Sequence, residues 1–206
     1  MQSTMISATE ETLLDDATRS SKITYAARFL SAAQADALFE ALGRETPFER
    51  EAPVMLGRAV EVRRRTCSYG EAGLRYRYSG VDRVAAPWHA ALAPLFAPLA
   101  RLTNVHFNYA LCQLYPDGEA GIGWHADKER DLVAGTPIAS LSLGAERDFH
   151  VRLGSKGPTV LSVRLGHGSL LVMGGATQRH YQHRVPTSAR CRVPRINLTF
   201  RVIRSA

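Results

Sequence analysis

The second half of the chain consists of short apolar segments separated by glycine and proline. Each segment is long enough for a strand and too short for a typical helix, and no helical pattern intervenes. Strands at this spacing predict a β-sandwich or a jelly roll, also called a double-stranded β-helix. The six segments cover residues 107–115, 138–143, 149–153, 159–165, 169–173 and 195–203.

The N-terminal part has a different pattern. Residues 1–22 are polar, mixed in charge and without periodicity, which predicts a flexible tail. Ser31 occupies the position of a helix N-cap, and apolar residues recur at helical spacing over residues 32–42. Gly43 is a residue type that suits the end of this helix.

Proline and glycine shape the rest of the first half. They predict a hairpin or loop over residues 44–66, and two short helices or one kinked helix over residues 88–102. At 206 residues the chain fits one domain after the tail, over residues 23–206. The predicted fold is α+β, mainly β: a helical cover over residues 23–104 is packed on a jelly-roll core over residues 105–206.

The charge balance narrows the class of partner. The formal net charge is +7 and the sequence pI is about 9.7, which favours acidic partners, nucleic acid first among them. All but three of the basic residues are arginines, which suit phosphate contacts but also accumulate in proteins of GC-rich genomes. Three widely spaced cysteines indicate neither a disulfide framework nor a zinc site. The sequence has no apolar run of membrane length and no signal pattern, so we expect a cytoplasmic protein, or a nuclear one in a eukaryote. A monomer is the default expectation.

One His-x-Asp pair stands out as a candidate metal site. His125 and Asp127 would point the same way on a strand, and His183 follows far downstream. Two imidazoles and one carboxylate on one face of a metal form the facial triad of non-haem Fe(II) oxygenases. Taken alone, the pair also fits two neighbouring surface residues. His180 competes with His183 for the third position, because both cannot serve in the same strand register.

The last predicted strand has a polar face and an apolar face. The polar positions are Arg195, Asn197, Thr199 and Arg201. In an ordinary sandwich strand such a face is directed to solvent. Two arginines flanking Asn and Thr also suit a dicarboxylate held inside a barrel, because guanidinium forks bind carboxylates bidentately. Gln113 and Tyr115 share a face of another predicted strand and could supply further hydrogen bonds.

These motifs resemble the AlkB family of Fe(II)- and 2-oxoglutarate-dependent dioxygenases, over roughly residues 54–203. The sequence is most similar to the branch of the second and third human AlkB homologues. The resemblance rests on His125-x-Asp127, His183, Pro194-Arg195-x-Asn197-Leu198-Thr199-Phe200-Arg201, Pro137-Ile138-Ala139-Ser140 and Gly166-His167-Gly168-Ser169-Leu170-Leu171.

The resemblance implies a role for each matching residue. Iron would be bound by His125, Asp127 and His183. The carboxylates of 2-oxoglutarate would pair with Arg195 and Arg201. Further residues of the co-substrate pocket would be Asn197, Thr199, Tyr115 and Gln113, the last at a position where the family usually has Asn.

The resemblance also implies substrate contacts. Glu129 matches an acidic position that contacts the exocyclic amine of the target base, and Tyr76 and Tyr78 match a strand that grips the extruded base. Core packing is the alternative for the two tyrosines. Leu56 matches the tip of a finger that fills the vacated base stack. The basic run Arg63, Arg64 and Arg65 would contact phosphates, or would form a plain basic loop.

The implied activity is oxidative demethylation of 1-methyladenine and 3-methylcytosine in DNA, a direct-reversal repair. Fe(II) would be the cofactor and 2-oxoglutarate and O₂ the co-substrates. The reaction would release formaldehyde and succinate. One alternative is an RNA or protein demethylase on the same scaffold. Another is a non-catalytic nucleic-acid-binding module. The sequence leaves open whether single- or double-stranded DNA is preferred.

Overall fold

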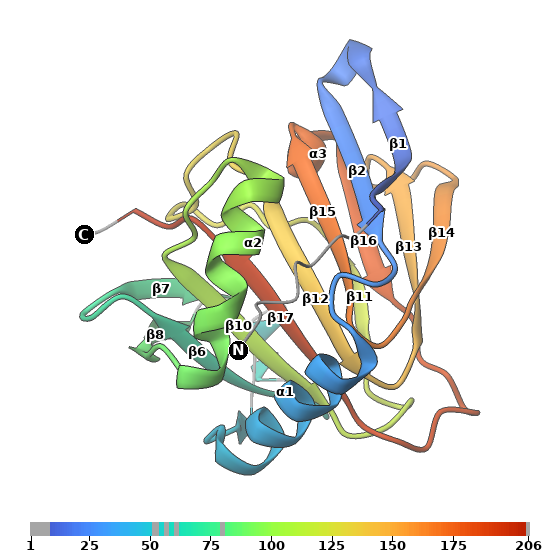
Figure 1. Ribbon diagram of the computed structural model, residues 1–206. Coiled ribbons are helices and arrows are strands. Elements are labelled where there is room, and N and C mark those ends of the chain that lie inside the picture. Colours follow the sequence, from blue (N-terminus) through green and yellow to red (C-terminus); the bar gives the residue numbers. More distant parts are fainter. Residues whose placement is uncertain (1–8, 51–53, 56–57, 60–61, 79–80, 205–206) are drawn as a thin grey trace.

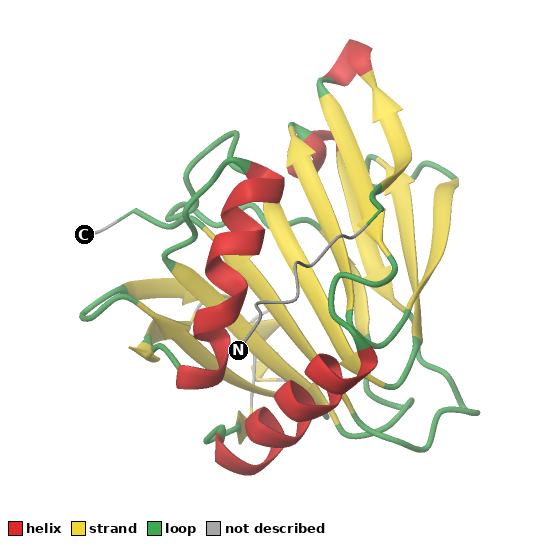
Figure 2. Cartoon of the chain, viewed as in Figure 1, coloured by secondary structure: helices red, strands yellow, loops and turns green. Residues whose placement is uncertain are grey.

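The computed structural model describes residues 9–50, 54–55, 58–59, 62–78 and 81–204, with only the backbone described within 54–59 and 76–83. Antiparallel strands are the main secondary structure. Most of them form two sheets that face each other, and the main helices lie over one face of the larger sheet (Figure 1; Figure 2). This is the predicted jelly roll with helices packed on it.

The larger sheet has nine strands. In spatial order they are β1 (Glu11–Asp16), β2 (Ser21–Ala26), β15 (Ser169–Gly175), β12 (Ile138–Gly144), β17 (Arg195–Arg201), β10 (Tyr109–Tyr115), β6 (Arg65–Gly70) and β3 (Glu49–Arg50), with β9 (Ala86–Pro87) beside β6. The smaller sheet contains β11 (Ile122–His125), β16 (Tyr181–Val185), β13 (Arg147–Leu153) and β14 (Thr159–Leu165). Two hairpins complete the strands: β4 (Val54–Met55) with β5 (Arg58–Ala59), and β7 (Arg75–Tyr78) with β8 (Val81–Val84).

The last strand lies near the centre of the fold. β17 pairs with β10 on one side and with β12 on the other, and all seven of its residues are buried. Its apolar face joins the core beneath the helices, and its polar face lies between the two sheets. The alternative of a solvent-directed polar face is therefore wrong.

Two longer helices cover the larger sheet. α1 (Ala32–Glu45) begins with a capping box between Ser31 and Gln34, and buries Ala35, Leu38 and Leu42. The predicted end at Gly43 is wrong, because the helix continues through that residue to a cap at Thr46. The region expected to form two short helices or one kinked helix is a 3₁₀ turn, η2 (Ala90–Leu92), followed directly by one helix, α2 (Ala93–Thr103). The two prolines inside α2 do not divide it.

The prediction of a flexible tail over residues 1–22 is wrong for the described part. Strand β1 leads through the 3₁₀ turn η1 (Ala17–Arg19) into β2, which pairs with β15 over its whole length. Leu13 and Leu14 pack against the core between the sheets. The pairing partner lies some 150 positions downstream, so local periodicity carries no sign of it.

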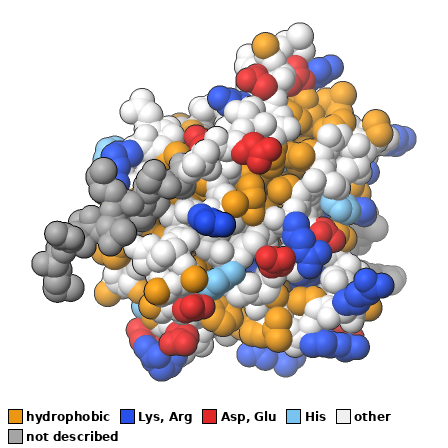
Figure 3. All heavy atoms as spheres, turned by 45° about the vertical axis from the view of Figure 1, so that its right-hand side comes forward, with side chains coloured by type: hydrophobic (Ala, Val, Ile, Leu, Met, Phe, Trp, Pro, Cys, Tyr) orange, Lys and Arg blue, Asp and Glu red, His pale blue; other side chains and the backbone are white. Residues whose placement is uncertain are grey.

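The region 23–104 is also more than a helical cover, because β2, β3, β6 and β9 belong to the larger sheet. No helix within the described ranges is long and apolar enough to cross a membrane. The face brought forward in Figure 3 has exposed hydrophobic side chains in its upper part and Lys and Arg side chains toward its lower right edge.

Candidate active site

Two strands of the smaller sheet bring the candidate metal ligands together. His125 ends β11 and lies directly opposite His183 of β16, with ring centroids 4.2 Å apart. Asp127 lies two residues beyond the end of β11. The expectation that it shares a strand with His125 is therefore wrong. Ligand atoms of the three residues lie within 4.8 Å of one another, the distance range that one metal ion can span. His180 ends α3 (Thr177–His180) and is not in this cluster.

Each ligand is held by a neighbouring group. Nδ1 of His125 lies 2.9 Å from the carbonyl oxygen of Gly123, so a proton on Nδ1 leaves Nε2 for a metal. The backbone N–H of Asp127 donates to Oε1 of Gln178 at 2.9 Å. Nη2 of Arg201 donates to Oδ1 of Asp127 at 3.1 Å. Such contacts orient the donor atoms before a metal arrives.

The protonation states also suit a metal. Burial raises the pKa of Asp127, but Arg201 and the two histidines outweigh it and hold that pKa below its usual value. Burial, followed by the proximity of His125, lowers the pKa of His183 to about 3. The carboxylate is thus charged and the imidazole neutral at physiological pH, which are the forms that bind divalent metals.

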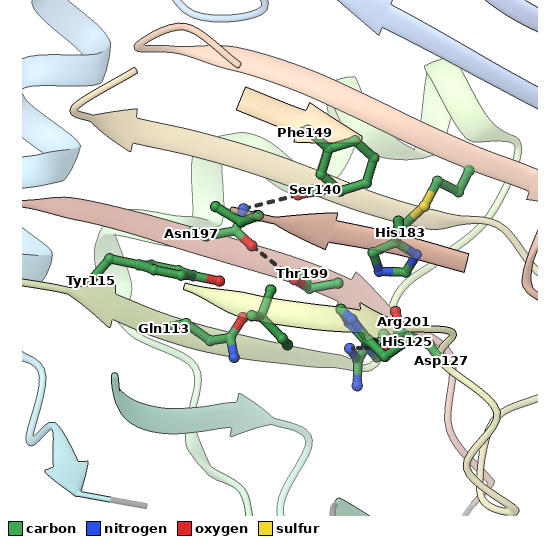
Figure 4. A pocket seen from close by; sticks show the side chains of 13 residues that line it. Gln113, Tyr115, His125, Asp127, Ser140, Phe149, His183, Asn197, Thr199 and Arg201 are labelled. Carbon is green, nitrogen blue, oxygen red and sulfur yellow. Dashed lines mark hydrogen bonds and ion pairs between the residues drawn. The ribbon is translucent and has the colours of Figure 1, made fainter. Parts of the chain in front are cut away.

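The triad lines a cavity between the two sheets, with about 390 Å³ of space unoccupied by protein atoms, part of it open to solvent. Figure 4 shows Tyr115 and Asn197 toward one end and the three candidate ligands toward the other. Apolar side chains close part of the wall. The lining residues are Gln113, Tyr115, Ile122, His125, Asp127, Ser140, Phe149, Met173, His183, Val185, Asn197, Thr199 and Arg201.

The polar side of the cavity presents donors in excess of acceptors. Asn197 donates to Ser140 Oγ and accepts from Thr199. Arg195 stacks on Tyr115, 5.0 Å from the ring centroid, and donates through Nη2 to Ser142 Oγ at 2.9 Å.

Several donors in this region lack a partner. Among the described residues, the buried Nε and Nη1 of Arg195 and Nε2 of Gln113 have none. Buried donors without partners are costly unless a ligand satisfies them. A dicarboxylate would accept hydrogen bonds from these donors, so Arg195 and Gln113 fit 2-oxoglutarate. The His–Asp–His cluster fits the metal.

Arg147 is a residue that the sequence analysis missed. It lies on the inward face of β13 with Phe149 and Val151 and is 2% exposed. Its guanidinium donates to four backbone carbonyls, which belong to Asp117, Gly118, Ala120 and Pro186. Arg147 also lies 5.9 Å from the ring centroid of Tyr115 and so ties two loops to the cavity wall. An arginine in register with buried apolar residues was the available signal.

The predicted basic run has one buried arginine and one exposed arginine in ion pairs. Arg64 is not available for phosphate, which corrects that prediction. It is 6% exposed, lies over the ring of Tyr115, and donates to the Gly121 carbonyl. Arg63 is exposed and pairs with Asp117 at 2.7 Å and with Glu119 at 3.0 Å.

Of Glu129, Leu56 and the two tyrosines, only Glu129 has a described side chain. Glu129 lines a neighbouring cleft that shares Asp127 with the metal cluster. Tyr76 and Tyr78 lie on β7, but the structure does not describe their side chains. Leu56 lies outside the described residues.

Comparison with known proteins decides the family. The model of the 2OG-Fe(II) oxygenase superfamily matches residues 22–201. The DNA oxidative demethylase ALKBH2 of Bos taurus is 38% identical over 181 residues, 83% of this chain and 65% of that protein. The human ALKBH2 is also 38% identical over 181 residues, and this chain covers 69% of that protein. The chain belongs to the AlkB branch of the 2OG-Fe(II) oxygenases.

Other relatives agree with this assignment. The human alpha-ketoglutarate-dependent dioxygenase alkB homolog 3 is 36% identical over 186 residues, 85% of this chain and 64% of that protein. This chain therefore spans slightly less than two thirds of the length of the Bos taurus ALKBH2 and of the human alkB homolog 3. The solved structure of OsALKBH1 shares the fold, with a TM-score of 0.61 at 18% identity, covering 87% of this chain and 96% of that one. Membership in the superfamily makes the chain an oxygenase that uses Fe(II), 2-oxoglutarate and O₂.

Proposed function

We propose that this oxygenase demethylates N-methylated bases, with 1-methyladenine and 3-methylcytosine in DNA as substrates. The balanced reaction consumes the N-methyl base, 2-oxoglutarate and O₂, and yields the free base, formaldehyde, succinate and CO₂. One oxygen atom enters succinate and the other the methyl group. The hydroxymethyl group then loses its hydroxyl proton and leaves as formaldehyde, while the electron pair of the C–N bond stays on the ring nitrogen. A cationic methylated base releases that proton to solvent.

One observation carries this proposal: a two-histidine, one-aspartate cluster shares a cavity with Gln113 and Tyr115, and Arg195 lies over Tyr115 with buried donors that have no partner among the described residues. When bound there, iron supplies the activation of O₂. The residues of the chain do the rest. Arg195 and Arg201 would pair with the carboxylates of 2-oxoglutarate, and Gln113 would supply a further donor. Phe149 and Met173 line the cavity and would keep water away from the metal cluster.

Nucleic acid as the substrate is supported by charge and by relatives. Both ALKBH2 and this chain lie in one branch of the family, and the name of that relative states an activity on DNA. The chain also has a cleft of about 660 Å³ lined by Arg50, Arg63 and Arg65. Arg50 and Arg65 lie directly opposite each other on β3 and β6, so three positively charged side chains line one cleft. A phosphate of the substrate would bind in this cleft.

Recognition of the base would involve Glu129 and the β7–β8 hairpin. Glu129 lies in a cleft that adjoins the metal cluster through Asp127, and a carboxylate favours a cationic methylated base. The two tyrosines of β7 supply aromatic faces for an extruded base.

The test is formaldehyde release from oligonucleotides that carry one 1-methyladenine. We expect release that requires both Fe(II) and 2-oxoglutarate, from single-stranded or double-stranded DNA. Comparison of the two DNA forms would show whether Leu56 acts as a finger in duplexes. Release from methylated RNA or a methylated peptide, but from neither DNA form, would overturn the choice of substrate while leaving the oxygenase assignment intact.

A further inference from the structure

A tryptophan held between two arginines lies on the outer face of the smaller sheet. The guanidinium carbon of Arg152 lies 4.5 Å from the ring centroid of Trp124, and that of Arg184 lies 4.6 Å from the same centroid. All three side chains are half-buried. Because both carbons are so close to one ring, the two positive charges are at most about 9 Å apart. We call these three residues the Arg–Trp–Arg stack.

One guanidinium group is fixed by a glutamine amide and the other by a histidine ring. Nε and Nη2 of Arg152 donate to Oε1 of Gln182 at 3.1 and 2.7 Å. Nε and Nη2 of Arg184 both lie 3.2 Å from Nδ1 of His150. These contacts hold the planes without neutralising the charges. The Nη1 groups make no hydrogen bond within the described residues, so donors remain for a ligand.

The stack differs from the other arginine on this face. Arg164 of β14 pairs with Glu146 at 3.0 Å and with Asp148 at 3.6 Å. In the described part of the chain, neither Arg152 nor Arg184 has a carboxylate within ion-pair distance. Two fixed like charges on one ring repel each other, and an anion bound beside them relieves that repulsion.

The stack is also next to the active site in the sequence. Trp124 precedes the candidate ligand His125 on β11, and Arg184 follows the candidate ligand His183 on β16. Within each strand the ligand faces inward and its neighbour outward. β11 is one of the two edge strands of the smaller sheet, so the stack lies behind the two ligand histidines, on the outer face of the sheet near this edge.

We propose that the Arg–Trp–Arg stack binds the phosphodiester backbone of the nucleic-acid substrate, outside the active-site cavity. Phosphate is the anion that arginine forks recognise, and the substrate proposed for the active site brings phosphates to this edge. The inference rests on the proposed function only in taking nucleic acid as the ligand. It adds a second contact to the cleft lined by Arg50, Arg63 and Arg65.

The experiment measures how salt weakens DNA binding. A labelled duplex about two helical turns long, roughly 20 base pairs, is titrated by fluorescence anisotropy at several NaCl concentrations. Each phosphate contact contributes about 0.9 to the slope of log K against log salt on duplex DNA. The variant with Arg152→Gln and Arg184→Gln should therefore lose about 1.8 from the wild-type slope. Its catalysis on a methylated trinucleotide, too short to reach the stack, should remain at the wild-type level.

Two control variants separate a specific contact from loss of charge or of folding. Arg164→Gln removes one positive charge that is already paired, and should leave the slope unchanged. Arg152→Lys with Arg184→Lys keeps both charges and should retain most of the slope. All variants are compared only if their melting temperatures lie within about 4 °C of the wild type.

The outcomes are distinguishable. If the wild type binds DNA and the Gln variant keeps the full slope, or if Arg164→Gln lowers it equally, the stack is not a backbone contact. An acidic protein partner would then be the remaining ligand class for this face. If the wild type binds no oligonucleotide and releases no formaldehyde from one, the proposed function itself fails.

Discussion

Arg201 and Asp127 form a buried ion pair, with Nη2 and Oδ1 3.1 Å apart and neither side chain more than 3% exposed. The pair joins the central strand of the larger sheet to the metal cluster beside the smaller sheet. It neutralises the Asp127 carboxylate in the metal-free protein, which a bound cation would otherwise do. The interaction therefore couples folding stability to metal binding.

We expect Arg201→Met to destabilise the metal-free protein by about 3–5 kcal/mol, because it leaves a buried carboxylate unpaired. Mn(II), a redox-stable substitute for Fe(II), should recover part of that loss by binding to Asp127. Urea unfolding with and without Mn(II) measures both effects. Arg195→Met is the control, since Arg195 bonds to Ser142 rather than to a metal ligand. Equal recovery in both variants would contradict the coupling.

Replacement of His183 should abolish metal binding. His183→Ala removes one of three ligands, whereas His180→Ala alters a histidine three residues away that is outside the cluster. We expect Mn(II) affinity to fall at least 100-fold in the first variant and to stay near the wild type in the second, by analogy with removal of groups that support metal sites. Equilibrium dialysis gives both values. Strong loss of affinity in His180→Ala would show that the distal ligand is misassigned.

Replacement of Arg195 should weaken 2-oxoglutarate binding. Its Nε and Nη1 are buried donors that wait for an acceptor, so Arg195→Lys loses the fork while it keeps the charge. We expect the KM for 2-oxoglutarate to rise at least tenfold, about 1.4 kcal/mol, with a smaller change in kcat. The exposed loop residue Arg192 provides the control, as Arg192→Lys should leave the KM unchanged. An unaltered KM in Arg195→Lys would refute the assignment.

Acid should loosen the β1–β2 hairpin. Hydrogen bonds from Tyr181, Thr18 and Arg19 hold the pKa of Asp16 well below its usual value, the bond from Tyr181 being the strongest. A depressed pKa adds stability above the unfolded value of about 3.9 and loses it as the pH falls below that value. The urea midpoint of the wild type should therefore drop below about pH 4 more steeply than that of Asp16→Asn. Asp15→Asn, at an exposed neighbouring position, should behave as the wild type does.

The strands of the core could be predicted because alternation along each segment reflects its two environments. The segment at 195–201 shows this most clearly, since its polar residues face the cavity and its apolar residues face the helices. The same pattern does not reveal pairing between distant segments. Leu13 and Leu14 are adjacent, and the residues around them show no alternation of apolar and polar types that would mark β1 as a strand. β1 pairs with β2, and β2 in turn pairs with β15.

The site was predictable in its residue types more than in its supporting contacts. His125 and Asp127 were found from their spacing, although Asp127 proved to lie past the strand. Arg64 lies in a basic run that favours a surface role, yet its guanidinium is buried against Tyr115. Such burial depends on which loop closes over the residue, and the sequence near Arg64 does not contain that loop.

The most direct test of the proposed activity compares a methylated oligonucleotide with an otherwise identical unmethylated one. Succinate and formaldehyde are measured in the same reaction, with Fe(II) and 2-oxoglutarate present. We predict that the 1-methyladenine strand stimulates succinate formation and yields formaldehyde in equal amount, while the unmethylated strand does neither. Equal succinate from both strands, without formaldehyde, would contradict demethylation of DNA bases by this protein.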